Sequence, residues 1–305
     1  MPRSTRPFRR LRESVRSRSS RPRRLRILCV GGVNLDEAIR LDGPLTPGEG
    51  AIGRSLGPRP GGGAAIAAAA LAQAGHAVTV AGVVGDDPHG AMLRTVLEEL
   101  GLDVSAVQVR PGPTTRALVL IEPSGERTII GVGGYRAEEL DGAALLGGGY
   151  AAVLTKLHAP DVPKIMAAHW AKGALTIGVL PRRGRAPLAA QVLIASEADL
   201  TPAERDEPLR LGRSMCGEAL RWLVVTRGAR GAEAFGVDGS HHTVPAEPVA
   251  VVDATGAGDV FAAGLLDALL RGEGIEAALR RGTSWAARHV AHEGSLPPAG
   301  LTATA

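Results

Sequence analysis

Aromatic residues and cysteines are scarce in this chain. Phe, Trp and Tyr make up 3% of the 305 residues, too few for the aromatic platforms that bind single-stranded nucleic acid. Nucleic acid is therefore not an expected partner. The only cysteines are Cys29 and Cys216, which excludes a disulfide framework and favours a reducing, cytoplasmic location. The sequence also contains no secretory signal and no apolar run long enough to span a bilayer, so no membrane association is predicted.

Several common motifs of enzymes are missing as well. The sequence has no G-x-x-x-x-G-K-[ST] loop and no G-x-S-x-G elbow, and the turn at Gly31-Gly32 lacks the G-x-G-x-x-G spacing. These absences argue against a Walker-type nucleotide enzyme, an α/β-hydrolase and a dinucleotide-binding fold. The histidines at 241–242 and at 289 and 292 have no cysteine or carboxylate at a spacing that completes a zinc site.

Positive charge is concentrated at the N-terminus. Residues 1–26 hold eleven arginines and one acid, so this segment carries +10, whereas the whole chain carries +4 and the remaining residues therefore carry −6. Such a Ser/Arg/Pro-rich stretch cannot bury enough apolar surface to fold, so residues 1–24 are predicted to be a disordered tail. The tail is interpreted as a dispensable extension or a mis-assigned translation start, with a targeting segment or a polyanion-binding arm as alternatives.

Strand and helix patterns alternate after this tail, which predicts a parallel α/β sheet. A break in the rhythm occurs where residues 114–121 and 126–130 flank Glu-Pro-Ser-Gly, a pattern typical of a β-hairpin and hence of a small β appendage. We expect strands at 25–30, 33–39, 77–84, 104–109, 151–155, 175–180, 191–195 and 222–226, and helices at 64–74, 90–100, 162–172, 202–221, 256–271 and 275–291.

The most informative stretch is Asp253-Ala254-Thr255-Gly256-Ala257-Gly258-Asp259, where an apolar strand runs through a glycine-rich turn into a helix. Backbone amides of such a turn, together with a helix N-terminus, can bind the oxygens of a phosphoryl group. A carboxylate beside a phosphate site is electrostatically unfavourable, which suggests that Asp259 takes a proton from an attacking hydroxyl. The alternative is that Asp259 only caps the helix.

This segment fills every position of D-x-x-G-A-G-D and so resembles the second signature of the PfkB, or ribokinase-like, carbohydrate kinases. The resemblance covers residues 31 to about 297. It implies a ribokinase-like three-layer α/β/α sandwich over 25–300, with a small β-sheet lid whose strands lie within 33–60 and 104–131. It also implies an ATP-dependent kinase that uses Mg²⁺ and has a place for K⁺, acts on a small-molecule sugar or nucleoside, and pairs as a homodimer through the lid.

The same resemblance assigns roles to individual residues. Asp259 would be the catalytic base, with Gly256, Ala257 and Gly258 as the anion hole. The substrate would be bound by Asn34, Asp36, Gly61, Gly62, Gly63 and the lid residue Arg116. The nucleotide would lie along Thr226, Gly228, Gly231, Thr255 and Thr283. Acidic ligands for metal would be Asp199, Glu197 and Asp253, with Asp253, Thr255 and the 291–295 loop at the position of the monovalent cation.

Departures from the family pattern concern the substrate and the metal. Ile66 stands where members usually carry a sugar-binding Asn, and the N-x-x-E motif occurs as Ser196-Glu197-Ala198-Asp199. The predicted function is phosphorylation of a hydroxyl on a sugar or related small molecule. A nucleoside kinase on the same fold and a catalytically weak sugar- or nucleotide-binding sensor remain as alternatives.

Overall fold

The computed structural model describes residues 24–133, 139–156, 159–180 and 187–303. The predicted disordered tail lies outside these ranges, apart from Arg24. No helix in the part of the chain that the structure describes combines the length and the apolar content needed to cross a bilayer.

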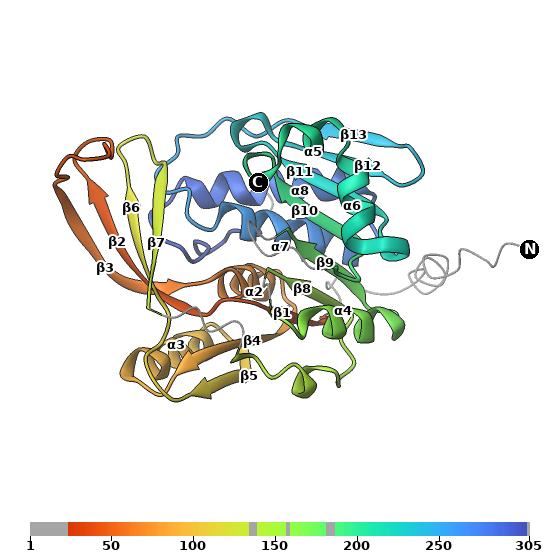
Figure 1. Ribbon diagram of the computed structural model, residues 1–305, viewed down its shortest axis with the longest axis horizontal. Helices are drawn as coiled ribbons and strands as arrows, with labels where there is room; N and C mark the ends of the chain where they lie inside the picture. The colour runs from red at the N-terminus through yellow and green to blue at the C-terminus, as the bar shows by residue number, and fades with distance from the viewer. Residues whose placement is uncertain (1–23, 134–138, 157–158, 181–186, 304–305) are drawn as a thin grey trace, which may run out of the picture.

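A nine-stranded sheet forms the centre of the molecule (Figure 1). Its strands are β1 Arg26–Val30, β4 Ala77–Gly85, β5 Asp103–Arg110, β8 Ala152–Thr155, β9 Leu175–Val179, β10 Val192–Ser196, β11 Trp222–Thr226, β12 Ala232–Gly236 and β13 His241–Val244. They are ordered β13-β12-β11-β10-β9-β8-β1-β4-β5. Pairing is parallel from β5 to β11 and antiparallel for β12 and β13. The prediction of a parallel α/β sheet is confirmed.

Helices cover both faces of this sheet and complete three layers. One face is packed by α2 Gly63–Gln73, α3 Pro88–Glu99, α7 Ala257–Leu270 and α8 Ile275–Val290, and the other by α4 Val162–Ala171 and α6 Pro208–Cys216, which follows the short helix α5 Pro202–Asp206. The strands are apolar on both faces, and β1 is an example. Its Ile27 and Cys29 pack in the core beneath α2 and α7, whereas Leu28 and Val30 pack in the core beneath α4 and α6. Complete burial raises the pKa of the Cys29 thiol to about 12, so Cys29 is a core residue.

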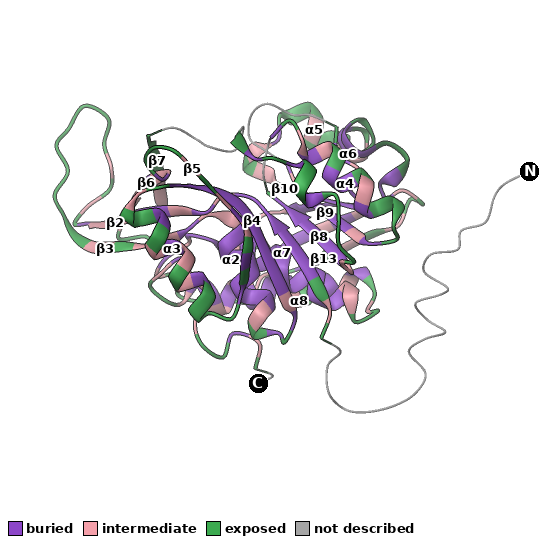
Figure 2. Cartoon of the chain, turned by 90° about the horizontal axis from the view of Figure 1, so that it is seen from below, coloured by how far each residue is buried: buried purple, intermediate pink, exposed green. Residues whose placement is uncertain are grey.

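A second, four-stranded sheet stands beside the large one, at the left of Figure 1. It consists of β2 Asn34–Leu41, β3 Gly53–Gly61, β6 Arg116–Ile121 and β7 Arg127–Val132, in the order β3-β2-β6-β7, and we refer to it as the lid sheet. Its own apolar cluster is small, and the β2–β3 connection is exposed (Figure 2). Strand 33–39 enters the lid sheet after the Gly31-Gly32 turn, within the range 33–60 expected for lid strands, whereas strand 104–109, in the other range expected for the lid, is β5 of the large sheet.

The parallel strands end at one edge of the large sheet, where ligands of open α/β folds bind. Gly32 follows β1, Lys156 follows β8, Glu197 follows β10 and Arg227 follows β11 at this edge. The lid sheet begins from the same edge, since β2 starts four residues after β1 ends. The fold therefore directs residues from distant parts of the sequence toward one region.

Candidate active site

The turn before α7, predicted to be the anion hole, combines a left-handed glycine with a helix N-terminus. Gly256 precedes the helix with φ of 84°, a left-handed conformation that glycine adopts without strain, and no described atom lies within 4 Å of where a Cβ on Gly258 would sit. The Ala257 N–H donates to the Ala254 carbonyl at 3.3 Å, so this amide is engaged within the turn. Helix α7 adds the partial positive charge of its N-terminus, and Asp259 stands in its first turn, 5% exposed.

Lys156 is the partner of Asp259. Its Nζ lies 2.7 Å from Oδ1 of Asp259, and its own side chain is 45% exposed. The N-cap position of α7 is Gly256, which has no side chain, and the Asp259 carboxylate is paired with Lys156. The arrangement therefore favours the interpretation of Asp259 as a group that faces a ligand over the interpretation as a helix cap.

Three consecutive glycines allow the chain to pass close to these side chains. A Cβ on Gly61 would lie 2.2 Å from the Asp36 carboxylate, and a Cβ on Gly62, whose φ is 97°, would lie 2.1 Å from the Gly32 carbonyl oxygen. A Cβ on Gly63 would lie 2.6 Å from Cδ of Lys156 and 2.8 Å from Oδ1 of Asp259. Only glycine fits at these positions, and the stretch brings the predicted substrate residues next to the predicted base.

Asn34 and Asp36 form a hydrogen-bonded pair at the start of β2. The Asn34 Nδ2 donates to Oδ1 of Asp36 at 2.6 Å. Burial raises the pKa of Asp36 to about 6, against the lowering effects of the Arg59 charge and the Asn34 hydrogen bond, while Asp253 and Asp259 add to the rise. A carboxyl and an amide side by side can bind vicinal hydroxyls.

Two basic residues at this site were missed by the sequence reasoning, Lys156 and Arg59. Lys156 is one of three lysines in the chain and directly follows an apolar strand pattern, a position that predicts the ligand-binding edge of a parallel sheet. Arg59 pairs in register with Asp36 between β3 and β2, and its Nη1 lies 2.9 Å from Oδ2 of Asp253. The sequence feature that could have indicated Arg59 is its position two residues before the first glycine of the stretch.

Arg116 lies beside the start of β2, paired in register with Leu35. It begins β6 and forms an ion pair with Glu37 of β2, and 40% of its side chain is exposed. Ile66 is 3% exposed and lies 3.1 Å from the Cβ position of Gly256, packed beneath the turn before α7. Ile66 therefore supports that turn and offers no open apolar surface to a substrate.

Of the residues predicted to contact the nucleotide, Thr226 ends β11, Gly228 and Gly231 follow it, Thr255 precedes α7 and Thr283 lies on α8. Thr226 donates to the Ala195 carbonyl at 3.3 Å, and Gly228 has φ of 55° with open space beside it. A Cβ on Gly231 would lie 2.0 Å from the Val244 carbonyl oxygen, so close strand packing already requires glycine there. Thr283 is buried, and its hydroxyl donates to the Arg280 carbonyl within α8.

The predicted acidic metal ligands do not gather into one cluster. Glu197 forms ion pairs with Arg227 and Arg230, whereas Asp253 is paired with Arg59. Among the described residues, no group of three or more His, Cys, Asp or Glu side chains could hold a metal ion by itself. This donor set fits Mg²⁺ only in the way that kinases usually bind it, with one or two carboxylates supplemented by water and the phosphates of the nucleotide.

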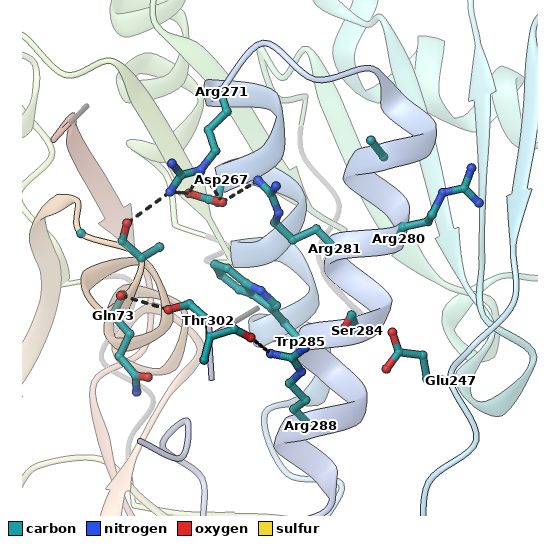
Figure 3. A pocket seen from close by; sticks show the side chains of 14 residues that line it. Gln73, Glu247, Asp267, Arg271, Arg280, Arg281, Ser284, Trp285, Arg288 and Thr302 are labelled. Carbon is teal, nitrogen blue, oxygen red and sulfur yellow. Dashed lines mark hydrogen bonds and ion pairs between the residues drawn. The ribbon is translucent and has the colours of Figure 1, made fainter. Parts of the chain in front are cut away.

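A separate cavity of about 650 Å³ lies at the C-terminal ends of α2 and α7 and along α8 (Figure 3). It is rich in arginine, yet its arginines are engaged. Arg271 and Arg281 bind the buried Asp267 at 2.7 Å, and Arg288 donates to the carbonyls of Leu301 and Ala303. The cavity wall thus joins the helix ends and the C-terminal segment, and it contains none of the residues predicted for catalysis.

The comparisons with known proteins all match sugar kinases. The profile described as pfkB family carbohydrate kinase matches residues 24–299. The ATP-dependent ribose-1-phosphate kinase of Halopiger xanaduensis is 32% identical over 284 residues, 89% of this chain and 94% of the relative. Ribokinase of Bacillus subtilis is 27% identical, over 84% of this chain and 90% of its own. Arabidopsis thaliana ribokinase, solved with ribose and ATP, superposes with a TM-score of 0.72 at 23% identity, covering 90% of this chain and 96% of that one.

Proposed function

This chain belongs to the pfkB family of carbohydrate kinases, ATP-dependent enzymes that phosphorylate sugar-like substrates, and from that premise we propose that Asp259 is its catalytic base. The ribokinase-like three-layer sandwich expected from the motifs is also that of the superposed structures. The observation that carries the proposal is the position of Asp259, buried in the first turn of α7 between the Gly256 turn and Lys156.

In the proposed reaction, the Asp259 carboxylate accepts the proton of a substrate hydroxyl. The hydroxyl oxygen forms a bond to the γ-phosphorus of ATP as the bond from that phosphorus to the bridging oxygen of ADP breaks, so ADP leaves. The amides of Gly256 and Gly258 and the start of α7 stabilise the negative charge on the transferring group, whereas the Ala257 amide, also predicted for the anion hole, is bonded to the Ala254 carbonyl. Positioning and electrostatics supply most of the acceleration in transfers of this kind.

Lys156 has two roles in this proposal. Its ammonium group neutralises Asp259 before the nucleotide arrives, and its exposed side chain can then turn toward the incoming phosphoryl oxygens. Asn34 and Asp36 hold the sugar hydroxyls on the lid side of the site, and Gly61–Gly63 permit their approach. Mg²⁺ would neutralise charge on the phosphates, with Asp199 and Glu197 holding it through water.

Production of ADP by the purified protein tests the proposal, measured with ATP and Mg²⁺ across pentoses, hexoses, nucleosides and sugar phosphates. We expect a substrate-dependent signal from at least one sugar or sugar phosphate. A signal from nucleosides alone would support the alternative of a nucleoside kinase. Binding of ATP with no turnover across the panel would support the alternative of a non-catalytic sensor.

A phosphorylated sugar is the second candidate substrate. The half-exposed ammonium of Lys156 beside Asp259 could bind a phosphate on the substrate in place of the γ-phosphate of ATP. The Halopiger relative is named as a kinase of ribose 1-phosphate. The ratio of kcat/KM for ribose 1-phosphate to that for ribose decides between the two substrates, and the Lys156→Met protein should lose the preference for the phosphorylated one.

The lid sheet supports a further part of the proposal, pairing of two chains. Its edge strand β7 exposes the apolar side chains of Ile129, Ile130 and Val132. An exposed apolar edge strand is a template for pairing with another strand. We expect a homodimer in sedimentation velocity and a shift toward the monomer for Ile130→Lys; a wild-type monomer at high concentration would contradict this expectation.

A further inference from the structure

The buried Asp253 carboxylate already has a positively charged protein partner. Its side chain is 0% exposed, and Nη1 of Arg59 lies 2.9 Å from its Oδ2. The Thr255 N–H donates to Oδ1 at 2.9 Å, and the Gly294 N–H donates to Oδ2 at 3.3 Å. Burial by itself would raise the pKa of Asp253, but the Thr255 hydrogen bonds and the Arg59 charge outweigh it and the pKa lies below its usual value. Asp253 is therefore held as a fully compensated carboxylate.

Asp253 and Thr255 are also the residues that the resemblance assigns to a monovalent cation. Thr255, like Asp253, has a partner within the protein. The Thr255 carbonyl oxygen lies 2.6 Å from Nε2 of His289. Because a carbonyl only accepts, Nε2 carries the proton of this bond. Burial lowers the pKa of His289, against the opposing effects of the Thr255 carbonyl and the nearby carboxylates. The Thr255 hydroxyl is buried without a partner among the described residues.

The two segments that a cation would bridge are bonded directly to each other. The N–H groups of Val252 and Asp253 donate to the Val290 carbonyl at 2.7 and 3.2 Å, and Gly294 donates to Asp253. The lid sheet is tied to the same loop, since Arg40 lies 2.7 Å from Glu293. These hydrogen bonds and this ion pair join the two segments and the lid sheet.

A second cation beside Asp253 would face the Arg59 guanidinium at close range in a buried site, where like charges repel strongly. We infer that Arg59 supplies the positive charge that a monovalent cation would otherwise bring to Asp253, so that this kinase folds and binds nucleotide independently of K⁺. The monovalent cation of the family therefore does not fit beside Asp253 and Arg59. The part of the inference that concerns ATP rests on the proposed function.

Thermal unfolding and ATP titration of the full chain test this inference in KCl and in tetramethylammonium chloride of equal ionic strength. Tetramethylammonium is too large to enter a site built for K⁺. We expect the wild-type Tm to agree within about 1 °C between the salts, a small shift on the scale of one interaction. The ATP affinity should agree within about twofold, well below the tenfold change that marks a differential interaction of about 1.4 kcal/mol.

Removal of the Arg59 charge should create the dependence that the wild type lacks. In Arg59→Met the buried Asp253 loses its partner, so we expect a lower Tm and about tenfold weaker ATP binding in tetramethylammonium, both partly restored by KCl. Arg54→Met is the matched control, because Arg54 lies on the same strand with its side chain 65% exposed. It should behave as the wild type in both salts.

Three results would overturn the inference: a wild-type Tm or ATP affinity raised by K⁺, an anomalous peak beside Asp253 in wild-type crystals soaked in RbCl, or an Arg59→Met protein that equals the wild type in both salts. If Arg59→Met does not fold, the wild-type comparison and the rubidium experiment still decide. Failure to bind ATP in either salt would refute the proposed function instead, and the Tm and rubidium results would remain valid for Asp253.

Discussion

Replacement of Asp259 by Asn separates catalysis from folding. The two side chains have nearly the same shape, so the first turn of α7 and the glycine stretch beside it should keep their packing. The lost interaction is the 2.7 Å ion pair with Lys156, whose side chain is 45% exposed. Such solvent-screened pairs contribute about 0–1 kcal/mol. We therefore expect little change in Tm. Turnover should fall by about 10² or more, or about 2.7 kcal/mol in activation free energy, because an amide cannot accept the hydroxyl proton.

Asp267→Asn is the matched control, with the same chemical change on the same helix. Asp267 is buried and accepts bonds from His76, Arg271 and Arg281. Removal of one partner from a buried pair costs about 3–5 kcal/mol, but Arg271 and Arg281 are 30% and 26% exposed, so solvent should reduce the loss to about 1–3 kcal/mol. We expect a lower Tm with unchanged turnover per folded molecule, the opposite of the result for Asp259.

The assay measures ADP release with the best substrate of the panel, alongside thermal unfolding of each protein. Wild-type turnover in Asp259→Asn would refute the assignment of the base. A loss of turnover accompanied by a fall in Tm as large as that of Asp267→Asn would show that Asp259 stabilises the fold and would remove the support for a catalytic role.

Two further predictions concern the substrate side of the site. Burial raises the pKa of Asp36 to about 6, so its carboxylate should be protonated as the pH falls through that value. We therefore expect KM for the sugar to rise below about pH 6. An equally steep dependence of KM on pH in the Asp36→Asn protein would contradict this expectation. For folding the sign is reversed, since the native state binds this proton more tightly than the unfolded chain and the contribution of Asp36 to stability is lost as the pH rises from about 4 to 6. Gly63→Ala should lower turnover with a smaller effect on Tm, because the new Cβ would lie 2.6 Å from Lys156 and 2.8 Å from Asp259. Gly131→Ala is the control, because Gly131 has open space around it. Equal turnover of the two variants would refute the close approach of Gly63 to Lys156 and Asp259.

Much of the fold could be predicted because its signals are local. Buried parallel strands are continuous apolar runs and the helices between them are bounded by glycine, so the alternation from β1 to α8 follows from the order of residues. The exceptions occur where a strand changes sheets. Nothing in the alternation of residues 33–39 indicates that β2 leaves the large sheet, because a lid strand and a core strand share the same period of two.

The proposed base and the turn beside it could be singled out from the sequence for the same reason. Residues 253–259 form one contiguous segment, and its turn and helix follow each other along the chain, although the apolar strand expected before the turn does not form, since β13 ends at Val244. Ile66 shows the limit of this reasoning. Its position in the motif suggested a wall of the sugar site, whereas the packing of α2 against α7 buries it beneath Gly256.

Tertiary structure alone determines which basic residues pair with Asp259 and Asp253. Lys156 reaches Asp259 because β8 pairs with β1, and Arg59 reaches Asp253 because the lid sheet folds back over the loop before α7. Each ion pair joins residues that are remote in the chain, and no local propensity determines which arginine or lysine meets which carboxylate. The sequence by itself determined the kind of chemistry, through a motif whose atoms are neighbours along the backbone. The order of the strands and the position of the lid decided which charges surround it, because those depend on how whole elements pack.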